Sequence, residues 1–157
     1  MFDCRLGVTF RSRDLAARRH PRLASIAYPG RAVLITICTH QRRPLFGVIA
    51  RDEQLSRVEL TVVGDIVRQE WASSSAASDA LMIMPDHIHG IVRVGRTRSF
   101  AAFVRGFKSA VTSRVRQETI DEVRNVWQRG YHDRILREDD VIAARNYIAA
   151  NPARWLL

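Results

Sequence analysis

The sequence predicts an α+β fold, a ferredoxin-like four-stranded antiparallel sheet with two packing helices plus a C-terminal helix. A length of 157 residues with 46% hydrophobic content suits one compact domain. Apolar residues recur with the period of a strand in some segments and of a helix in others. Their order is strand, helix, strand, strand, helix, strand, helix, which is typical of this arrangement with one added helix.

The first half of the chain supplies a basic lead-in, a buried strand and a helix. Residues 1–30 are rich in arginine and show no clear period, which indicates a basic N-terminal arm before a domain at residues 31–157. The β-branched, apolar run at residues 32–39 predicts a buried strand. After a slightly acidic connector, helical spacing of apolar residues predicts a helix whose buried face holds Val63, Ile66, Val67 and Trp71.

The central segment predicts a hairpin followed by a basic helix. Strands at residues 81–84 and 87–94 flank a turn at Pro85-Asp86. Ser99 is the predicted N-cap of the next helix. The apolar stripe of that helix consists of Phe100, Phe103, Val104, Phe107, Val111 and Val115.

The C-terminal segment predicts a final strand and the last helix. Alternating aromatic and aliphatic residues indicate a strand over residues 126–136. Acidic side chains at residues 138–140 suit the positive end of a helix dipole. We expect this helix to end at Asn151, because Pro152 disfavours helical geometry in the residue before it.

The charge of the chain predicts an anionic partner, of which nucleic acid is the usual one. A formal charge of +9 comes from 25 basic side chains, with Lys108 the only lysine, against 16 acidic ones. Residues 93–116 hold seven positive side chains and no acid. The alternative is a solvated, arginine-rich surface without a binding role, but this clustering favours nucleic acid.

Other features bear on the cellular location. No aliphatic stretch is long enough to span a bilayer, and the first residues lack the apolar core of a signal peptide. We therefore expect a cytoplasmic protein without a membrane partner. Cys4 and Cys38 have neither metal-site spacing nor the number of a disulfide framework, so we expect reduced thiols.

Two histidines mark a candidate metal site. Side chains alternate across a strand, so His87 and His89 project from one face. Gly90 lies on the other face and leaves room for a closely packed helix. Two imidazoles at this spacing can hold one divalent cation. The alternative is a pair of ordinary strand histidines bonded to their neighbours.

The last helix adds a candidate nucleophile. Tyr147 and Asn151 are four residues apart and therefore share a helix face. A phenol with a pKa of about 10 attacks a phosphodiester well only if a cation withdraws charge from the phosphate. Two neutral imidazoles and an amide oxygen would hold Mg²⁺ or Mn²⁺ with positions left open. The alternative for Tyr147 is a packed side chain with a bonded hydroxyl.

An ordered set of motifs supports this combination. His-Ile-His at residues 87–89 follows Met-Pro-Asp, and Tyr-Ile-Ala-Ala-Asn-Pro stands at residues 147–152. Further matching segments lie at residues 34–40, 45–47, 107–109 and 127–133. The set resembles the single-tyrosine HUH transposases, and within them the REP-associated tyrosine transposase branch. The resemblance covers residues 28–155.

The resemblance implies a ferredoxin-like core and a transposase that cuts and rejoins single-stranded DNA at or near repeat hairpins. Tyr147 would become linked to a DNA 5′-phosphate, His87 and His89 would bind the metal, and Asn151 would be a third ligand. It also implies a bacterial protein that acts at the nucleoid, and it leaves a homodimer open. Asp86 stands where relatives often have asparagine, so it either strengthens metal binding or only favours the turn.

Phosphate contacts are expected on the basic helix and in the segment before it. The candidates are Arg96, Arg98, Arg105 and Lys108. A solvated helix face is the alternative for each of them. The resemblance implies that the DNA partner is a short extragenic palindrome folded as a hairpin, with single-stranded DNA beside it.

Two other functions are compatible with the sequence. A non-catalytic hairpin-binding module on the same fold would keep the charge pattern and need no metal, but the intact histidines and Tyr147 argue against it. A metal-dependent phosphodiesterase that uses water would need a general base beside the metal, for which Asp86 is the candidate.

Overall fold

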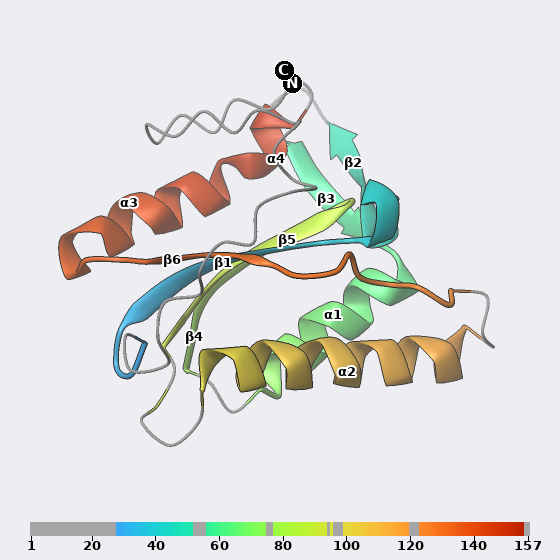
Figure 1. Ribbon diagram of the computed structural model, residues 1–157. Coiled ribbons are helices and arrows are strands. Elements are labelled where there is room, and N and C mark those ends of the chain that lie inside the picture. The colour runs from blue at the N-terminus through green and yellow to red at the C-terminus, as the bar shows by residue number, and fades with distance from the viewer. Residues whose placement is uncertain are drawn as a thin grey trace.

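A four-stranded antiparallel sheet with the strand order β4-β5-β1-β6 forms the centre of the computed structural model (Figure 1). The structure describes residues 28–51, 56–74, 77–93, 95, 99–119 and 123–155. The strands of this sheet are β1 (Ala32–Cys38), β4 (Ala77–Met84), β5 (His87–Arg93) and β6 (His132–Ile135). The first of these strands lies between the third and the fourth, which is the ferredoxin-like order that the sequence predicts.

Two helices cover one face of the sheet. Helices α1 (Val62–Ala72) and α2 (Phe100–Glu118) lie side by side against it (Figure 1). The hydroxyls of Thr61 and Ser99 cap them, each accepting a backbone N–H at 3.2 Å. Every residue of the two predicted apolar stripes is buried, so both helix predictions are confirmed.

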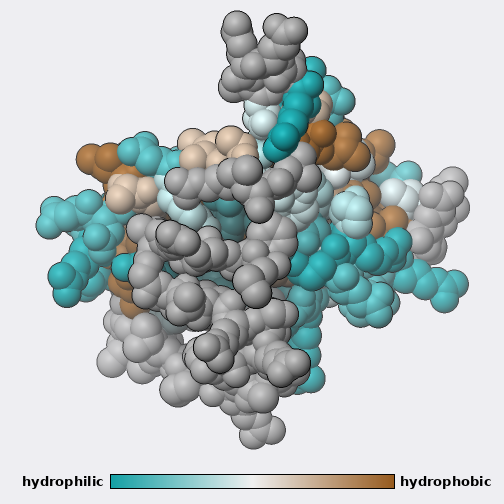
Figure 2. Space-filling view, turned by 90° about the horizontal axis from the view of Figure 1, so that it is seen from above, coloured by the Kyte–Doolittle hydropathy of each residue, from teal (hydrophilic) through white to brown (hydrophobic). Residues whose placement is uncertain are grey.

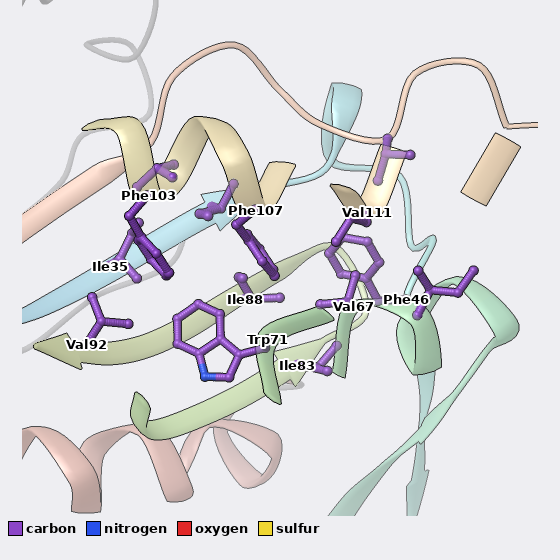
Figure 3. Packing of buried hydrophobic residues seen from close by; sticks show 14 of the residues in the cluster. Ile35, Phe46, Val67, Trp71, Ile83, Ile88, Val92, Phe103, Phe107 and Val111 are labelled. Atoms are coloured by element: carbon purple, nitrogen blue, oxygen red, sulfur yellow. The ribbon is translucent and has the colours of Figure 1, made fainter. Parts of the chain in front are cut away.

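Aromatic and aliphatic side chains fill the space between these helices and the sheet (Figure 3). The indole of Trp71 meets the ring of Phe107 edge to face, with ring centroids 5.4 Å apart. On the sheet side it lies against Gly90, where a Cβ atom would come within 2.5 Å of Cζ2 of Trp71 and closer still to Cη2. Gly90 therefore allows the close approach of helix and strand that the sequence predicts.

Helix α3 (Glu138–Ala149) covers the opposite face of the sheet (Figure 1). Its buried residues join a second apolar cluster made of Ala32, Ile91, Leu136, Val141, Ala144 and Ile148. Ion pairs hold both ends of the helix to the sheet: Arg145 contacts Asp79 on β4 at 2.6 Å, and Glu138 contacts Arg93 on β5 at 2.7 Å. The sheet is thus enclosed between α1 and α2 on one side and α3 on the other.

A second hairpin occupies the segment that the sequence analysis treats as a connector. Strands β2 (Gly47–Arg51) and β3 (Ser56–Leu60) pair with each other in a separate two-stranded sheet. In β3, half-buried and exposed residues alternate, and the exposed ones are Arg57 and Glu59. Each of these strands has only five residues and neither gives a sustained periodic pattern, which explains why they were not predicted.

The C-terminal segment departs from the prediction at two points. The predicted strand at residues 126–136 is too long, because Gly130 adopts a positive φ of 84° and only β6 pairs as a strand, with an isolated bridge at Trp127. The last helix ends at Ala149 instead of Asn151. Pro152 then lies in the first turn of a short helix, α4 (Asn151–Arg154), where proline is tolerated.

The packed domain begins before residue 31. Tyr28 is buried, its ring stacks on Phe100 with centroids 5.0 Å apart, and its hydroxyl donates to Asp133 at 2.7 Å. Tyr28, near the end of the predicted N-terminal arm, therefore belongs to the core. Residues 1–27 of that arm, including Cys4, lie outside the described part of the chain.

Seen from above, the described part of the surface carries hydrophilic side chains toward both sides, with smaller apolar patches among them (Figure 2). Among the described residues, large apolar side chains are exposed at Val48, Val62 and Ile142. Within the same residues, no helix has the length and hydrophobicity needed to cross a bilayer.

Candidate metal and nucleophile site

The two histidines of β5 meet on the face of the sheet that α3 covers. His87 and His89 are each only 7% exposed, and their Nε2 atoms lie 3.1 Å apart. The rings are nearly perpendicular, with centroids 4.6 Å apart. Strand alternation places both side chains on one face, so the predicted juxtaposition is present.

The second nitrogen of each ring has a polar partner. The Nδ1 atom of His87 lies 2.6 Å from a carboxylate oxygen of Asp86, and that of His89 lies 2.8 Å from the hydroxyl of Thr36. Burial lowers the pKa of His89 to about 3, and the nearby His87 and Arg42 add to this effect. His89 is therefore neutral at physiological pH, which is the form that binds a metal ion.

A chain of polar contacts extends behind His87. The guanidinium Nε of Arg42 lies 2.8 Å from the second carboxylate oxygen of Asp86, and its Nη1 donates to Sγ of Cys38 at 2.8 Å. Burial raises the pKa of the Cys38 thiol, so the thiol stays protonated and is a poor metal ligand. Arg42 and Thr36 were not among the predicted site residues, because one comes from an irregular turn and the other from a different strand.

The tyrosine of α3 reaches the histidine pair. The ring of Tyr147 meets that of His89 at 66°, with centroids 5.8 Å apart. Just beyond, Trp155 covers His87 with centroids 5.6 Å apart. Trp155 was not among the predicted site residues, and the structure places its ring against that of His87.

Asn151 lies one helical turn after Tyr147, as predicted. Its side-chain amide donates from Nδ2 to the backbone carbonyl of Tyr147 at 2.9 Å. This bond fixes the amide nitrogen on the helix end, so that Oδ1 is the amide atom suited to a cation. Asn151 is half-buried, and it belongs to α4 because the helix is interrupted at Ala150.

The geometry of the histidine pair fits a divalent cation. Adjacent ligands of an octahedral ion with bonds of about 2.1 Å are separated by about 3 Å, close to the distance between the two Nε2 atoms. Within the described ranges, no three histidine, cysteine, aspartate or glutamate side chains are grouped as a metal site. The ion would therefore need oxygen ligands of another kind, such as an amide, a phosphate or water.

Comparison with known proteins identifies the family. Residues 33–151, which include His87, His89 and Tyr147, match the family described as IS200-like transposases. The chain belongs to this transposase family. It is 29% identical to an uncharacterized protein of Haemophilus influenzae, over 88% of this chain and 89% of that protein.

One solved structure shows that the fold of this transposase is shared. It is the structure of a REP-associated tyrosine transposase bound to a REP hairpin, with a TM-score of 0.56 and 18% sequence identity. The similarity covers 80% of this chain and 68% of that one. The ferredoxin-like sheet and its helices therefore have a counterpart in a solved protein.

The two predicted DNA-contacting residues that the structure describes, Arg105 and Lys108, do not lie at the histidines. Arg105 is exposed on α2, on the opposite face of the sheet from Tyr147. Lys108 is half-buried and donates to the backbone carbonyls of Gln128 and Gly130 at 2.8 and 3.1 Å. Its ammonium thus stabilises the loop before β6. Arg96 and Arg98 lie outside the described residues.

A polar groove runs along α2 beside Lys108. It has a volume of about 550 Å³. Its lining consists of Lys108, Ser109, Thr112, Ser113, Arg116, Gln117 and Trp127. Hydroxyl and cationic groups of this kind suit contacts with a phosphate backbone, but such contacts would lie across the sheet from Tyr147.

Proposed function

We propose that this protein is a divalent-metal-dependent transposase that cuts and rejoins single-stranded DNA through a covalent bond between Tyr147 and a DNA 5′-phosphate. The observation that carries the proposal is the convergence of Tyr147 with His89 and His87 on one face of the sheet. The match to the transposase family supports the general activity. The proposal goes further than the family match in three respects: the metal, the single-stranded substrate and the phosphotyrosine bond.

The proposed reaction assigns a role to each side chain. The phenolic oxygen of Tyr147 attacks the phosphorus, forms an O–P bond and releases its proton to solvent. The P–O3′ bond breaks, and the leaving oxygen takes up a proton to become a 3′-hydroxyl. A later attack by a 3′-hydroxyl reverses the step and rejoins the strand without a nucleotide cofactor.

The histidines prepare the site for this chemistry. His87 and His89 would hold Mg²⁺ or Mn²⁺ through Nε2, with the amide oxygen of Asn151 as a third ligand. When bound, the cation withdraws charge from the scissile phosphate and stabilises the leaving oxygen. The ring of Trp155 packs against that of His87.

The proposed substrate is DNA that contains a repeat hairpin with a single-stranded flank. The similar solved protein binds a REP hairpin, and we assign this chain to the same REP-associated branch, acting at the bacterial nucleoid. The charge of +9 supports an anionic partner. Arg105 and the groove along α2 would contact the backbone of the stem, while Tyr147 acts on the single strand.

The test is adduct formation on a labelled hairpin oligonucleotide with a single-stranded flank. With Mg²⁺ or Mn²⁺, the wild type should form a covalent protein–DNA species that survives denaturing electrophoresis. Tyr147→Phe should abolish it while hairpin binding persists, and Tyr131→Phe, on the far face of the sheet, should leave it unchanged. Chelation of the metal should stop adduct formation and spare hairpin binding.

Three results would contradict the proposal in different ways. An undiminished adduct with Tyr147→Phe would remove Tyr147 from the reaction. Hairpin binding without an adduct under any metal condition would indicate a non-catalytic binding module. Multiple-turnover cleavage that survives Tyr147→Phe would indicate a phosphodiesterase that uses water.

A further inference from the structure

The two site histidines have chemically different partners at their second ring nitrogens. A carboxylate of Asp86 lies 2.6 Å from Nδ1 of His87, whereas a hydroxyl of Thr36 lies 2.8 Å from Nδ1 of His89. A carboxylate only accepts hydrogen bonds, but a hydroxyl donates or accepts as its neighbour requires. Asp86 therefore constrains His87 to carry a proton on Nδ1, whereas Thr36 is compatible with either tautomer of His89.

Arg42 keeps the Asp86 carboxylate in place. Its Nε donates to Oδ2 of Asp86 at 2.8 Å, while Oδ1 faces His87. The Asp86 side chain is nearly inaccessible to solvent, whereas that of Arg42 is 42% exposed. A buried carboxylate with a guanidinium on one oxygen and an imidazole on the other has little freedom to rotate.

The backbone that carries Arg42 is strained. Gln41 and Arg42 have φ values of 55° and 56°, in the left-handed region that residues other than glycine rarely adopt. Thr39 holds this turn, because its hydroxyl donates to the carbonyl of Arg43 at 2.7 Å and its N–H donates to the carbonyl of Asp86 at 2.9 Å. The strained turn and the aspartate are thus joined through one buried residue.

We propose that Arg42 and Asp86 are positioning residues that fix His87 with its proton on Nδ1, while Thr36 allows His89 to change tautomer. This inference rests on the proposed role of both histidines as metal ligands. It assigns a function to the polar chain behind His87, which no part of the reaction described above uses.

For two neutral rings, the hydrogen-bond distances select one tautomer of each in the metal-free protein. With the Nδ1–H of His87 donating to Asp86, Nε2 of a neutral His87 accepts. Nε2 of His89, 3.1 Å away, must then donate to it, and Nδ1 of His89 accepts from the hydroxyl of Thr36. Metal binding needs a lone pair on both Nε2 atoms. His89 then loses a proton from Nε2 and gains one on Nδ1 by exchange with water, and the Thr36 hydroxyl turns to accept it.

Long-range ¹H–¹⁵N NMR of the imidazole rings tests this assignment. In metal-free wild type, we expect the proton on Nδ1 of His87 and on Nε2 of His89. Addition of Zn²⁺, a diamagnetic probe that binds imidazole, should move the His89 proton to Nδ1 and leave that of His87 in place. A His87 proton found on Nε2, or a His89 proton that does not move, would overturn the proposal.

Variants separate positioning from general folding. Asp86→Asn should give mixed His87 tautomers and raise the Mn²⁺ dissociation constant by about 10- to 100-fold, the usual effect of losing such a partner. Arg42→Gln should act in the same direction and covers the case that Asp86→Asn does not fold. Asp65→Asn is the matched control, because Asp65 pairs with Arg68 on α1, on the opposite face of the sheet from the histidines.

The outcome for these variants decides the proposal independently of the DNA reaction. Wild-type tautomers and Mn²⁺ affinity in both Asp86→Asn and Arg42→Gln would refute it, as would an equal loss in Asp65→Asn. The tautomers are measured without DNA and without Tyr147 chemistry. Failure of adduct formation would therefore not affect the tautomer assignment, and a wrong tautomer assignment would not exclude the reaction at Tyr147.

Discussion

Gly90 offers the sharpest test of how the fold positions the site. It follows His89 on β5, and its missing side chain makes room for the indole of Trp71. In Gly90→Ala the new Cβ would lie 2.5 Å from Cζ2 of Trp71, well inside van der Waals contact. Trp71 is only 3% exposed and is held by the rings of Phe103 and Phe107, so it has no space into which to rotate.

The expected cost follows from this geometry. Overpacking of a well-filled core costs about 1–3 kcal/mol, and the rigid indole places Gly90→Ala in the upper part of that range. For a chain of this size, a loss of about 2 kcal/mol lowers Tm by roughly 4–8 °C. The strand must also shift, so the Nε2 atoms of His87 and His89 should separate and Mn²⁺ affinity should fall.

Urea unfolding of the wild type and its variants measures the effect. Gly106→Ala is the matched control: Gly106 lies on the exposed side of α2 with no atom near its Cβ position, so alanine there should stabilise by about 0.5–1 kcal/mol. Trp71→Phe removes the ring that the methyl group of Gly90→Ala would strike. The double variant of Gly90→Ala with Trp71→Phe should therefore be more stable than the sum of the single effects predicts, by about 1 kcal/mol or more.

Two results would refute this reasoning. One is a stability of Gly90→Ala within about 0.5 kcal/mol of wild type, the range of a surface substitution. The other is strict additivity with Trp71→Phe, which would show that the indole is not the obstacle.

Two further predictions concern acid stability and the docking of α3. Because burial lowers the pKa of His89 to about 3, below its ordinary value of 6.5, the unfolded chain binds a proton between these values that the folded chain does not. The free energy of unfolding of the metal-free protein should therefore fall as pH falls from 6.5 towards 3, by up to about 1.4 kcal/mol per pH unit from this group. In urea unfolding, His89→Gln should show a weaker dependence of this free energy on pH. An equal dependence in wild type and His89→Gln would contradict the assignment. The ion pairs of Arg145 with Asp79 and Arg93 with Glu138 join α3 to the sheet. Replacing both arginines by glutamine should speed hydrogen exchange in α3 and slow adduct formation while α2 exchanges as before, whereas unchanged exchange in α3 would show that apolar packing alone holds it.

The sequence predicts those parts of the molecule whose structure follows from a single helical or strand periodicity. Alternation in β5 predicts that His87 and His89 share a face and that Gly90 lies opposite, and the structure shows both. Helical spacing predicts that Tyr147 and Asn151 lie one turn apart, and the amide of Asn151 indeed donates to the backbone carbonyl of Tyr147. These features depend on local geometry that repeats along the chain.

Periodic patterns in the sequence could not predict the contacts that orient the site. Arg42 reaches Asp86 only because Gln41 and Arg42 adopt left-handed backbone geometry. The residue types in this turn do not predict that geometry. Thr36 meets His89 through the register of β1 with β5, a pairing that one sequence does not determine. The position of Trp155 over His87 depends on the short helix that follows Ala150.

Tyr147 is proposed to hold the DNA covalently during the reaction. The most direct measurement of this bond is mass spectrometry of the adduct after nuclease trimming and proteolysis. We predict that the remaining nucleotide is attached through its 5′-phosphate to the phenolic oxygen in the peptide that contains Tyr147. Attachment to any other residue, or through a 3′-phosphate, would contradict the account.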